Sequence, residues 1–181
     1  QKMEAGAVGS FLGVRECDVT LAIAEKTKQV LTERGYQVIM TRESNDVNMS
    51  WAERARLAEK SGAGALIHIH AHSQESTSVT GVLASCQSSR NPYNGDLASE
   101  SYALSSCIAG SVSQAAGAKN RGVKQTDTSS EINWSQVPVT SLETGFLSNQ
   151  QEELLLSQEE YQSQIAVGIA DGLDQFFAGR R

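Results

Sequence analysis

Segments with helical periodicity alternate along this chain with short runs of β-prone residues, and this alternation restricts the fold more than any other feature of the sequence. From Glu16 to Arg34 apolar side chains recur at helical spacing, and a glycine follows. Further helices are expected over residues 51–60, 97–116 and 158–177. Strands are expected over residues 36–41, 65–72, 81–86 and 138–144. Because helix and strand alternate, the sequence predicts an α/β fold with a largely parallel, twisted sheet flanked by helices.

Size and charge narrow the class of protein. A chain of 181 residues can bury about 70% of its unfolded surface, and no linker or repeat divides it, so we expect a single domain over residues 1–181. The net charge of -6 comes without clusters of Lys and Arg, which argues against nucleic acid as a partner. No apolar run is long enough to span a bilayer. We expect a monomer.

Three cysteines, Cys17, Cys86 and Cys107, leave two interpretations open. A disulfide between Cys86 and Cys107 with one free thiol would suit an exported protein. Alternatively, all three are small buried thiols, since cysteine is among the most buried residue types. No Cys-x-x-Cys pair is present, so a thiolate zinc site is not expected.

All three histidines lie in the segment LIHIHAH, residues 66–72. On a strand they share one face, but the outer two are separated by about 13 Å along the backbone. A zinc ion needs its nitrogen ligands at about 2.0 to 2.1 Å, so one ion cannot bind all three. Ligands of open α/β sheets bind beyond the carboxyl ends of the strands, which favours His70 and His72 over His68.

Hydrolytic zinc sites usually combine His with carboxylate ligands and keep one position for water. Glu16 is a candidate ligand, although an acid at the start of a helix also stabilises the helix dipole. Glu143 lies in the otherwise uncharged segment 138–146, where a carboxylate is costly to bury without a partner or a function. The polar stretch 120–135, with Asp127 and Trp134, is either one wall of a substrate groove or a plain surface loop.

Six segments resemble, in order, the zinc-dependent family of N-acetylmuramoyl-L-alanine amidases. They are RECDVTLAIA (15–24), GYQVIMTRESND (35–46), ERARLAEKSGAGALIHIHAH (53–72), GAKNRGVKQTD (117–127), INWSQVPVTSLETGFLSNQQEE (132–153) and YQSQIAVGIADGLDQFF (161–177). The resemblance implies a secreted bacterial cell-wall hydrolase. Its substrate would be peptidoglycan, cut at the amide between N-acetylmuramic acid and L-alanine of the stem peptide.

The resemblance also assigns roles to residues. It places the family's glutamate ligand of Zn²⁺ on Glu16, the strand histidine ligand on His70 and the catalytic glutamate on Glu143. The implied reaction is metal-assisted amide hydrolysis, in which Glu143 takes a proton from water and returns it to the leaving amine. Arg42 and Arg54 correspond to structural anchors.

Two departures from the family pattern leave the third ligand open. The family's first strand ends in a zinc-binding His, and here that strand would precede Gln1, so it is absent or truncated. His72 stands where the family usually has Asn. Either the upstream His completes the site, or His72 replaces it as a ligand, or the domain is a degenerate one that binds peptidoglycan without cutting it.

Overall fold

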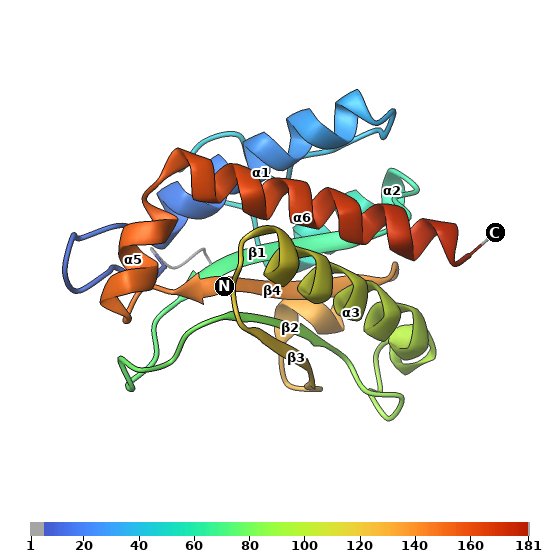
Figure 1. Cartoon of the computed structure of the whole chain (residues 1–181). Coiled ribbons are helices and arrows are strands. Elements are labelled where there is room, and N and C mark those ends of the chain that lie inside the picture. The colour runs from blue at the N-terminus through green and yellow to red at the C-terminus, as the bar shows by residue number, and fades with distance from the viewer. Residues whose placement is uncertain (1–5, 181) are drawn as a thin grey trace.

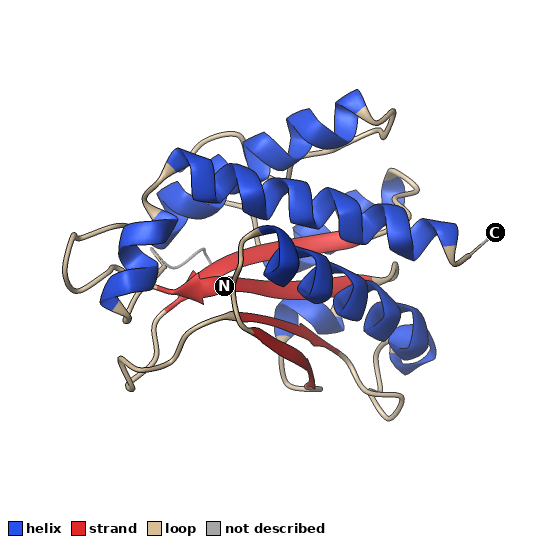
Figure 2. Cartoon of the chain, viewed as in Figure 1, coloured by secondary structure: helices blue, strands red, loops and turns tan. Residues whose placement is uncertain are grey.

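The computed structural model describes residues 6–180 as one layered α/β unit (Figures 1 and 2). Its elements, in chain order, are α1 (Glu16–Glu33), α2 (Trp51–Lys60), β1 (Leu66–His72), β2 (Val82–Cys86), the short 3-10 helix η1 (Gly95–Leu97), α3 (Ala98–Ala115), β3 (Asn120–Gln125), α4 (Ser130–Asn133), β4 (Val139–Phe146), α5 (Gln150–Leu156) and α6 (Glu159–Ala178). The expected α/β class is confirmed.

The sheet has four strands in the order β1-β4-β2-β3. The pairs β1/β4 and β2/β3 are parallel, and the central pair β2/β4 is antiparallel. The sheet is therefore largely parallel, as expected, with β1 and β4 running side by side in the same direction (Figure 1).

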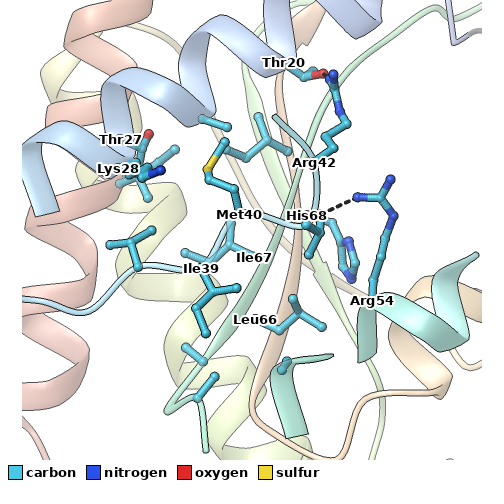
Figure 3. Close-up of a pocket in the computed structure, with 18 of the residues that line it drawn as sticks. Thr20, Thr27, Lys28, Ile39, Met40, Arg42, Arg54, Leu66, Ile67 and His68 are labelled. Atoms are coloured by element: carbon cyan, nitrogen blue, oxygen red, sulfur yellow. Dashed lines mark hydrogen bonds between the residues drawn. The ribbon is translucent and has the colours of Figure 1, made fainter. Parts of the chain in front are cut away.

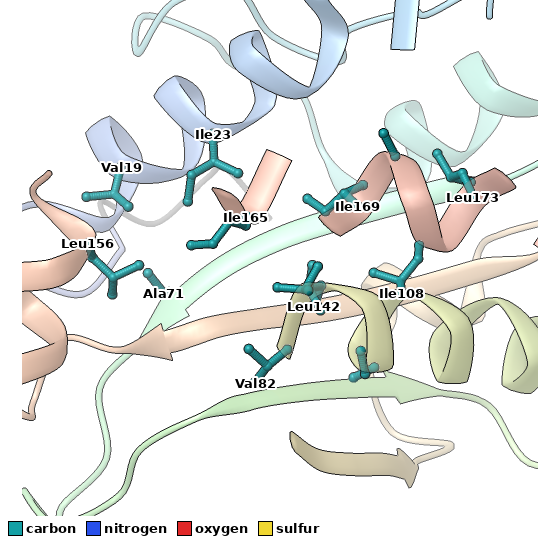
Figure 4. Packing of buried hydrophobic residues seen from close by; sticks show 14 of the residues in the cluster. Val19, Ile23, Ala71, Val82, Ile108, Leu142, Leu156, Ile165, Ile169 and Leu173 are labelled. Carbon is teal, nitrogen blue, oxygen red and sulfur yellow. The ribbon is translucent and has the colours of Figure 1, made fainter. Parts of the chain in front are cut away.

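One face of this sheet carries the main core. Helices α1, α6 and α3 lie over it (Figure 1). Their apolar faces meet the strands in a single cluster that includes Ile23, Ile108, Leu142 and Ile169 (Figure 4). All four of these side chains are fully buried, and burial of each contributes about 1.5 to 3 kcal/mol to folding.

The opposite face is covered by α2 and α4. Leu66 of β1 and Val139 of β4 pack there against Ala58 and Ile132. Since side chains alternate between faces along a strand, His68 and His70 share this face with Leu66. The histidines of β1 thus point toward α2 and α4 rather than into the main core.

Helix α2 begins as the sequence predicts. Ser50 accepts a hydrogen bond from the backbone N–H of Glu53, and the Glu53 carboxylate accepts one in return from the N–H of Ser50 at 2.8 Å. This capping box satisfies donors that the first turn of a helix would otherwise leave unpaired. It fixes the first residue of α2, Trp51, beside the histidines of β1.

The strand expected over residues 36–41 is not formed, and that prediction is wrong. The segment is extended and faces β1 across a cavity, with Ile39 and Met40 opposite Ile67 (Figure 3). A strand requires a neighbour that completes a ladder of backbone hydrogen bonds, and no described strand pairs with this segment. The free edge of β1 therefore borders a cavity instead of another strand.

The cysteines and the helices bear on two further expectations. All three cysteines are free, so no disulfide joins Cys86 to Cys107. Cys86 is buried in β2, where burial raises the pKa of its thiol. Across residues 6–180, none of the helices is long and apolar enough to span a bilayer.

Candidate metal centre and active site

The candidate site lies at the carboxyl ends of the two neighbouring parallel strands β1 and β4. His70 and Glu143 are register partners in this pair. Partners in adjacent strands present their side chains on the same face of the sheet. The sheet thereby brings together two predicted functional residues that lie 73 positions apart in the sequence. Glu16, the first residue of α1, approaches the same place from the other side of β1.

Glu16 and His70 are in direct contact. The Oε1 atom of Glu16 lies 3.1 Å from Nδ1 of His70. The carboxylate also accepts hydrogen bonds from the backbone N–H of Ala7 at 2.7 Å and of Ala71 at 3.3 Å. Burial opposes ionisation of Glu16, but these partners outweigh burial and hold its pKa below the ordinary value. Glu16 is thus an ionised carboxylate fixed against one nitrogen of His70.

The second nitrogen of His70 has a carboxylate partner that the sequence did not predict. Nε2 of His70 lies 2.8 Å from Oε2 of Glu131, in the short helix α4. Burial disfavours the charged form of the His70 ring. The hydrogen bonds and charges of the two carboxylates outweigh this effect and raise the pKa of His70 to about 10. Burial likewise opposes ionisation of Glu131, but the hydrogen bond with His70 and the charge of that ring, with smaller contributions from His68 and Ser141, together outweigh burial and lower the pKa of Glu131 to about 2.

Glu143 differs from the other two acids in its electrostatic surroundings. Its Oε2 atom accepts a hydrogen bond from the backbone N–H of His72 at 3.2 Å. Burial raises the pKa of Glu143 and outweighs the nearby rings of His70 and His72, which lower it. A carboxylic acid with a raised pKa is better suited to exchange protons near neutral pH than an ordinary glutamate.

The other two histidines of β1 are placed differently. His68 is buried with its ring edge-on to Trp51, the centroids 5.2 Å apart, and burial lowers its pKa to about 4. It is a neutral packing residue. His72 is exposed beyond an irregularity in the register of β1 with β4. Its ring forms no hydrogen bond with Glu16 or His70 among the described residues.

Comparison with known proteins identifies the family to which this chain belongs. The sequence profile of N-acetylmuramoyl-L-alanine amidases matches residues 1–175. The chain belongs to this amidase family. It is 31% identical over 175 residues to the uncharacterized protein YqiI of Bacillus subtilis, covering 96% of this chain and 79% of YqiI. It is 30% identical to the N-acetylmuramoyl-L-alanine amidase LytC of the same organism, where the match covers 96% of this chain but only 33% of LytC.

Solved amidase structures share the fold over nearly the whole domain. The catalytic domain of CwlV, an N-acetylmuramoyl-L-alanine amidase from Bacillus (Paenibacillus) polymyxa var. colistinus, superposes with a TM-score of 0.85 at 29% identity, covering 97% of this chain and 92% of CwlV. An amidase from Clostridium difficile 630 superposes with a TM-score of 0.87 at 25% identity, covering 98% of this chain and 92% of the other. These relatives support an amidase and give no support to the non-catalytic alternative.

The residues of this amidase fit part of a zinc site. Two ligands bound at about 2.0 to 2.1 Å in a tetrahedral arrangement lie about 3.3 Å apart. The 3.1 Å between Glu16 Oε1 and His70 Nδ1 is close to that separation, and carboxylate oxygen with imidazole nitrogen is a common donor set for zinc. Within residues 6–180, no three His, Cys, Asp or Glu side chains form a cluster able to hold a metal. In the described part of the amidase, Glu16 and His70 are therefore the candidate ligand positions.

A cavity of about 770 Å³ leads from this pair along the free edge of β1. One wall is the segment 36–42 and the other is β1, and Gly6 and Ala7 line the cavity together with Glu16 and His70. Figure 3 shows Ile39, Met40 and Arg42 on the side opposite Ile67 and His68. The cavity thus lies between two extended segments that do not pair with each other, and residues of α1, α2 and α6 complete its lining.

Arg42 and Arg54 occupy anchoring positions, in line with what the resemblance implied. Arg42 donates hydrogen bonds to the carbonyl of Cys17 at 2.7 Å and to the hydroxyl of Thr20 at 3.0 Å. These bonds join the segment 36–42 to α1. Arg54 donates to Thr41 and lies over the ring of Trp51, 5.4 Å from its centroid. Both guanidinium groups hold the segments that surround β1.

The polar stretch 120–135 is not a plain loop, because it contains β3 and α4. Asp127 accepts hydrogen bonds from the N–H and the hydroxyl of Ser88 at 2.8 and 2.6 Å, so it joins two loops rather than facing a groove. Trp134 is 53% exposed and lies beside Tyr93, with ring centroids 6.4 Å apart. Its expected place in a groove wall stays a prediction.

Proposed function

We propose that this domain hydrolyses the amide between N-acetylmuramic acid and L-alanine of the peptidoglycan stem peptide, with Zn²⁺ as its cofactor. The observation that carries the proposal is the meeting of Glu16, His70 and Glu143 at the carboxyl ends of β1 and β4. Glu16 and His70 are the proposed zinc ligands, and Glu143 is the proposed catalytic residue. Because peptidoglycan lies outside the bacterial cytoplasm, we propose a secreted, cell-wall location, and we propose that the domain works as a monomer.

In the proposed reaction, Glu143 transfers the proton and the backbone of His72 positions Glu143. When bound, the zinc ion supplies Lewis-acid chemistry for the amide carbonyl and lowers the pKa of water. The Glu143 carboxylate accepts the proton of the attacking water, and the resulting acid donates it to the amide nitrogen of the departing L-alanine. The N–H of His72 holds the Glu143 carboxylate in position for both transfers. Burial of Glu143 raises its pKa, which makes the carboxylate a stronger base than an exposed one.

The third zinc ligand is a separate proposal. We propose that the cavity beside β1 receives the additional strand that the family resemblance predicts before Gln1, and that its last residue supplies the missing His. Two observations support this place: the free edge of β1, and the approach of Gly6 and Ala7 to Glu16 and His70 within the same cavity. The ring of His72, the other candidate third ligand, forms no hydrogen bond with Glu16 or His70 among the described residues.

Purified sacculi test the reaction. We expect the zinc-loaded protein to release stem peptides with a free L-alanine amino terminus. Glu143→Gln should lower the rate by about 100-fold or more, because it removes the group that transfers the proton, and should leave zinc binding intact. Glu160→Gln, an exposed acid on α6, is the matched control and should cleave like the parent. Cleavage by Glu143→Gln at the parental rate would show that the role of Glu143 is wrong.

Removal of the metal tests the cofactor. Treatment with a chelator should abolish release of stem peptides, and zinc added back should restore it while Mg²⁺ should not, because a His and carboxylate site prefers zinc. A protein that cleaves equally well after metal removal, with zinc verified as absent by elemental analysis, would rule out the zinc mechanism.

A further inference from the structure

The contact between Glu131 and His70 is an interaction at the site to which the proposed reaction gives no role. The two side chains meet at 2.8 Å with only 15% and 21% of their surfaces exposed. Glu131 comes from α4, whereas His70 lies in β1, and Glu16 occupies the other nitrogen of the same ring. The imidazole is therefore held between two carboxylates from different parts of the chain.

Glu131 and Glu16 cannot act as ligands of one ion together with His70. The two ring nitrogens of an imidazole face in diverging directions, and each is set by its own partner. An ion beside Glu16 binds at Nδ1, so Nε2 and its partner lie on the far side of the ring. Glu131 is thus a partner of the ligand and is not itself a ligand.

The short helix α4 gives Glu131 a fixed position. Ile132, the next residue, is fully buried in the cluster shared by α2, β1 and β4. Ser129 donates from its hydroxyl to Oε1 of Glu131 at 3.3 Å, which leaves Oε2 for His70. The backbone next to Glu131 is therefore held by packing, and Oε2 of its carboxylate faces His70.

From this geometry we propose that Glu131 is a positioning residue for the metal centre: it holds the proton of His70 on Nε2, so that Nδ1 presents its lone pair to zinc beside Glu16. An ionised carboxylate only accepts hydrogen bonds, so Glu131 selects the tautomer whose Nε2 is the donor. Carboxylate partners of this kind orient metal-binding imidazoles in many sites. The inference rests on the proposed zinc function of Glu16 and His70.

Zinc affinity and the state of the His70 ring test this role without measuring catalysis. The dissociation constant of zinc is measured on the full chain by competition with a chromophoric chelator. We expect Glu131→Ala to weaken zinc binding about 10- to 100-fold. Glu131→Gln keeps the size of the side chain and an oxygen that accepts from Nε2, so it should lose less. Glu59→Gln, an exposed acid on α2, removes the same charge away from the site and should bind zinc like the parent.

Nitrogen-15 NMR of the zinc-loaded protein supplies the second readout. The parent should show His70 with a protonated Nε2 and a metal-bound Nδ1, and Glu131→Ala should lose this single state. Circular dichroism confirms that each variant is folded, and Glu131→Gln keeps the test decisive if Glu131→Ala does not fold.

Three results would overturn the inference while leaving the zinc function in place. They are parental zinc affinity with an unchanged tautomer in both Glu131 variants, weakened affinity with an unchanged tautomer, and an equal loss of affinity in Glu59→Gln. A parent protein that binds no zinc even when the upstream strand proposed to carry the third ligand is present would instead overturn the proposed function, and this inference with it.

Discussion

Glu153 carries a carboxylate with no exposed surface at all. Its oxygens accept hydrogen bonds from the backbone N–H groups of Phe11 and Leu12, each at 2.9 Å, and of Val14 at 3.1 Å. These bonds join α5 to the loop that leads into α1 and Glu16. We expect Glu153→Gln to lower the free energy of unfolding by about 2 kcal/mol, because the amide loses charge-assisted bonds and buries an unmatched donor. Urea denaturation at pH 7 measures the change, and Glu160→Gln should show none.

The pH dependence of stability gives a second check on the same carboxylate. Burial alone would raise the pKa of Glu153, but the backbone donors outweigh burial and hold it below the ordinary value of 4.5. The ionised group therefore stabilises the fold above pH 4.5, and its contribution is lost as the pH falls through 4.5 toward the folded pKa. The stability difference between the parent and Glu153→Gln should shrink between pH 7 and pH 3. A difference that stays constant would show that ionisation is not its cause.

The sequence predicts only part of the site at this scale. Family register and the uncharged segment 138–146 pointed to Glu16, His70 and Glu143, which the structure brings to the ends of two adjacent strands. Glu131 could not be predicted, because its contact joins residues 61 positions apart and its helix has only four residues. A helix of that length has no hydrophobic periodicity to detect.

Among the described helices, α3 and α6 pack together most extensively. Two glycines of α6 permit it: a Cβ atom on Gly168 would lie 2.5 Å from Cα of Val112, and one on Gly172 would lie 2.6 Å from Cα of Ile108. Because the obstructing atoms belong to the backbone of α3, the helices must move apart to admit a side chain. Gly172→Ala should therefore destabilise the fold by about 1 to 3 kcal/mol, although alanine is the better helix former.

Gly110→Ala is the control for this prediction. Gly110 lies in α3, and the nearest atom to a Cβ there is Nδ2 of Asn120 at 4.0 Å. With space available, replacing a helical glycine should raise stability by about 0.5 to 1 kcal/mol. Urea and thermal unfolding of the two variants should move in opposite directions. A Gly172→Ala protein as stable as the parent would show that the helices can separate at no cost.

The three long helices, α2 and the strands β1 and β2 were predicted to within one or two residues, whereas β3, α4 and α5 were not predicted. Helices α1, α3 and α6 each run for 18 to 20 residues, long enough for periodicity to mark their ends within one or two positions. Strand β3 and the helices α4 and α5 were missed, since segments of four to seven residues are too short to show a clear periodicity. The strand over 36–41 was predicted from composition, but a strand also needs a partner.

At the scale of the whole molecule, the position of the site depends on the order of strands in the sheet. The sequence pattern does not encode this order. Alternation of helices and strands predicted a largely parallel sheet, but not that β2 would run antiparallel to β4 or that β1 would lie at an edge. Pairing order is set by packing between segments distant in the chain, so no local signal specifies it. This order places His70 at the boundary between the sheet and the cavity, where a ligand can reach it.

Hydrogen exchange of β1 in the 181-residue chain tests this architecture. Leu66 donates its N–H to the carbonyl of Pro138, on the β4 side. Because N–H groups alternate between the two edges of a strand, those of His68 and His70 also face β4, while those of Ile67 and Ile69 face the cavity. We expect the amides of Ile67 and Ile69 to exchange at least about tenfold faster than those of His68 and His70. The four residues alternate along one strand, so each pair is the control for the other. Equal protection of all four would show that the edge of β1 is already paired in solution, and that the cavity is filled by chain rather than open to water.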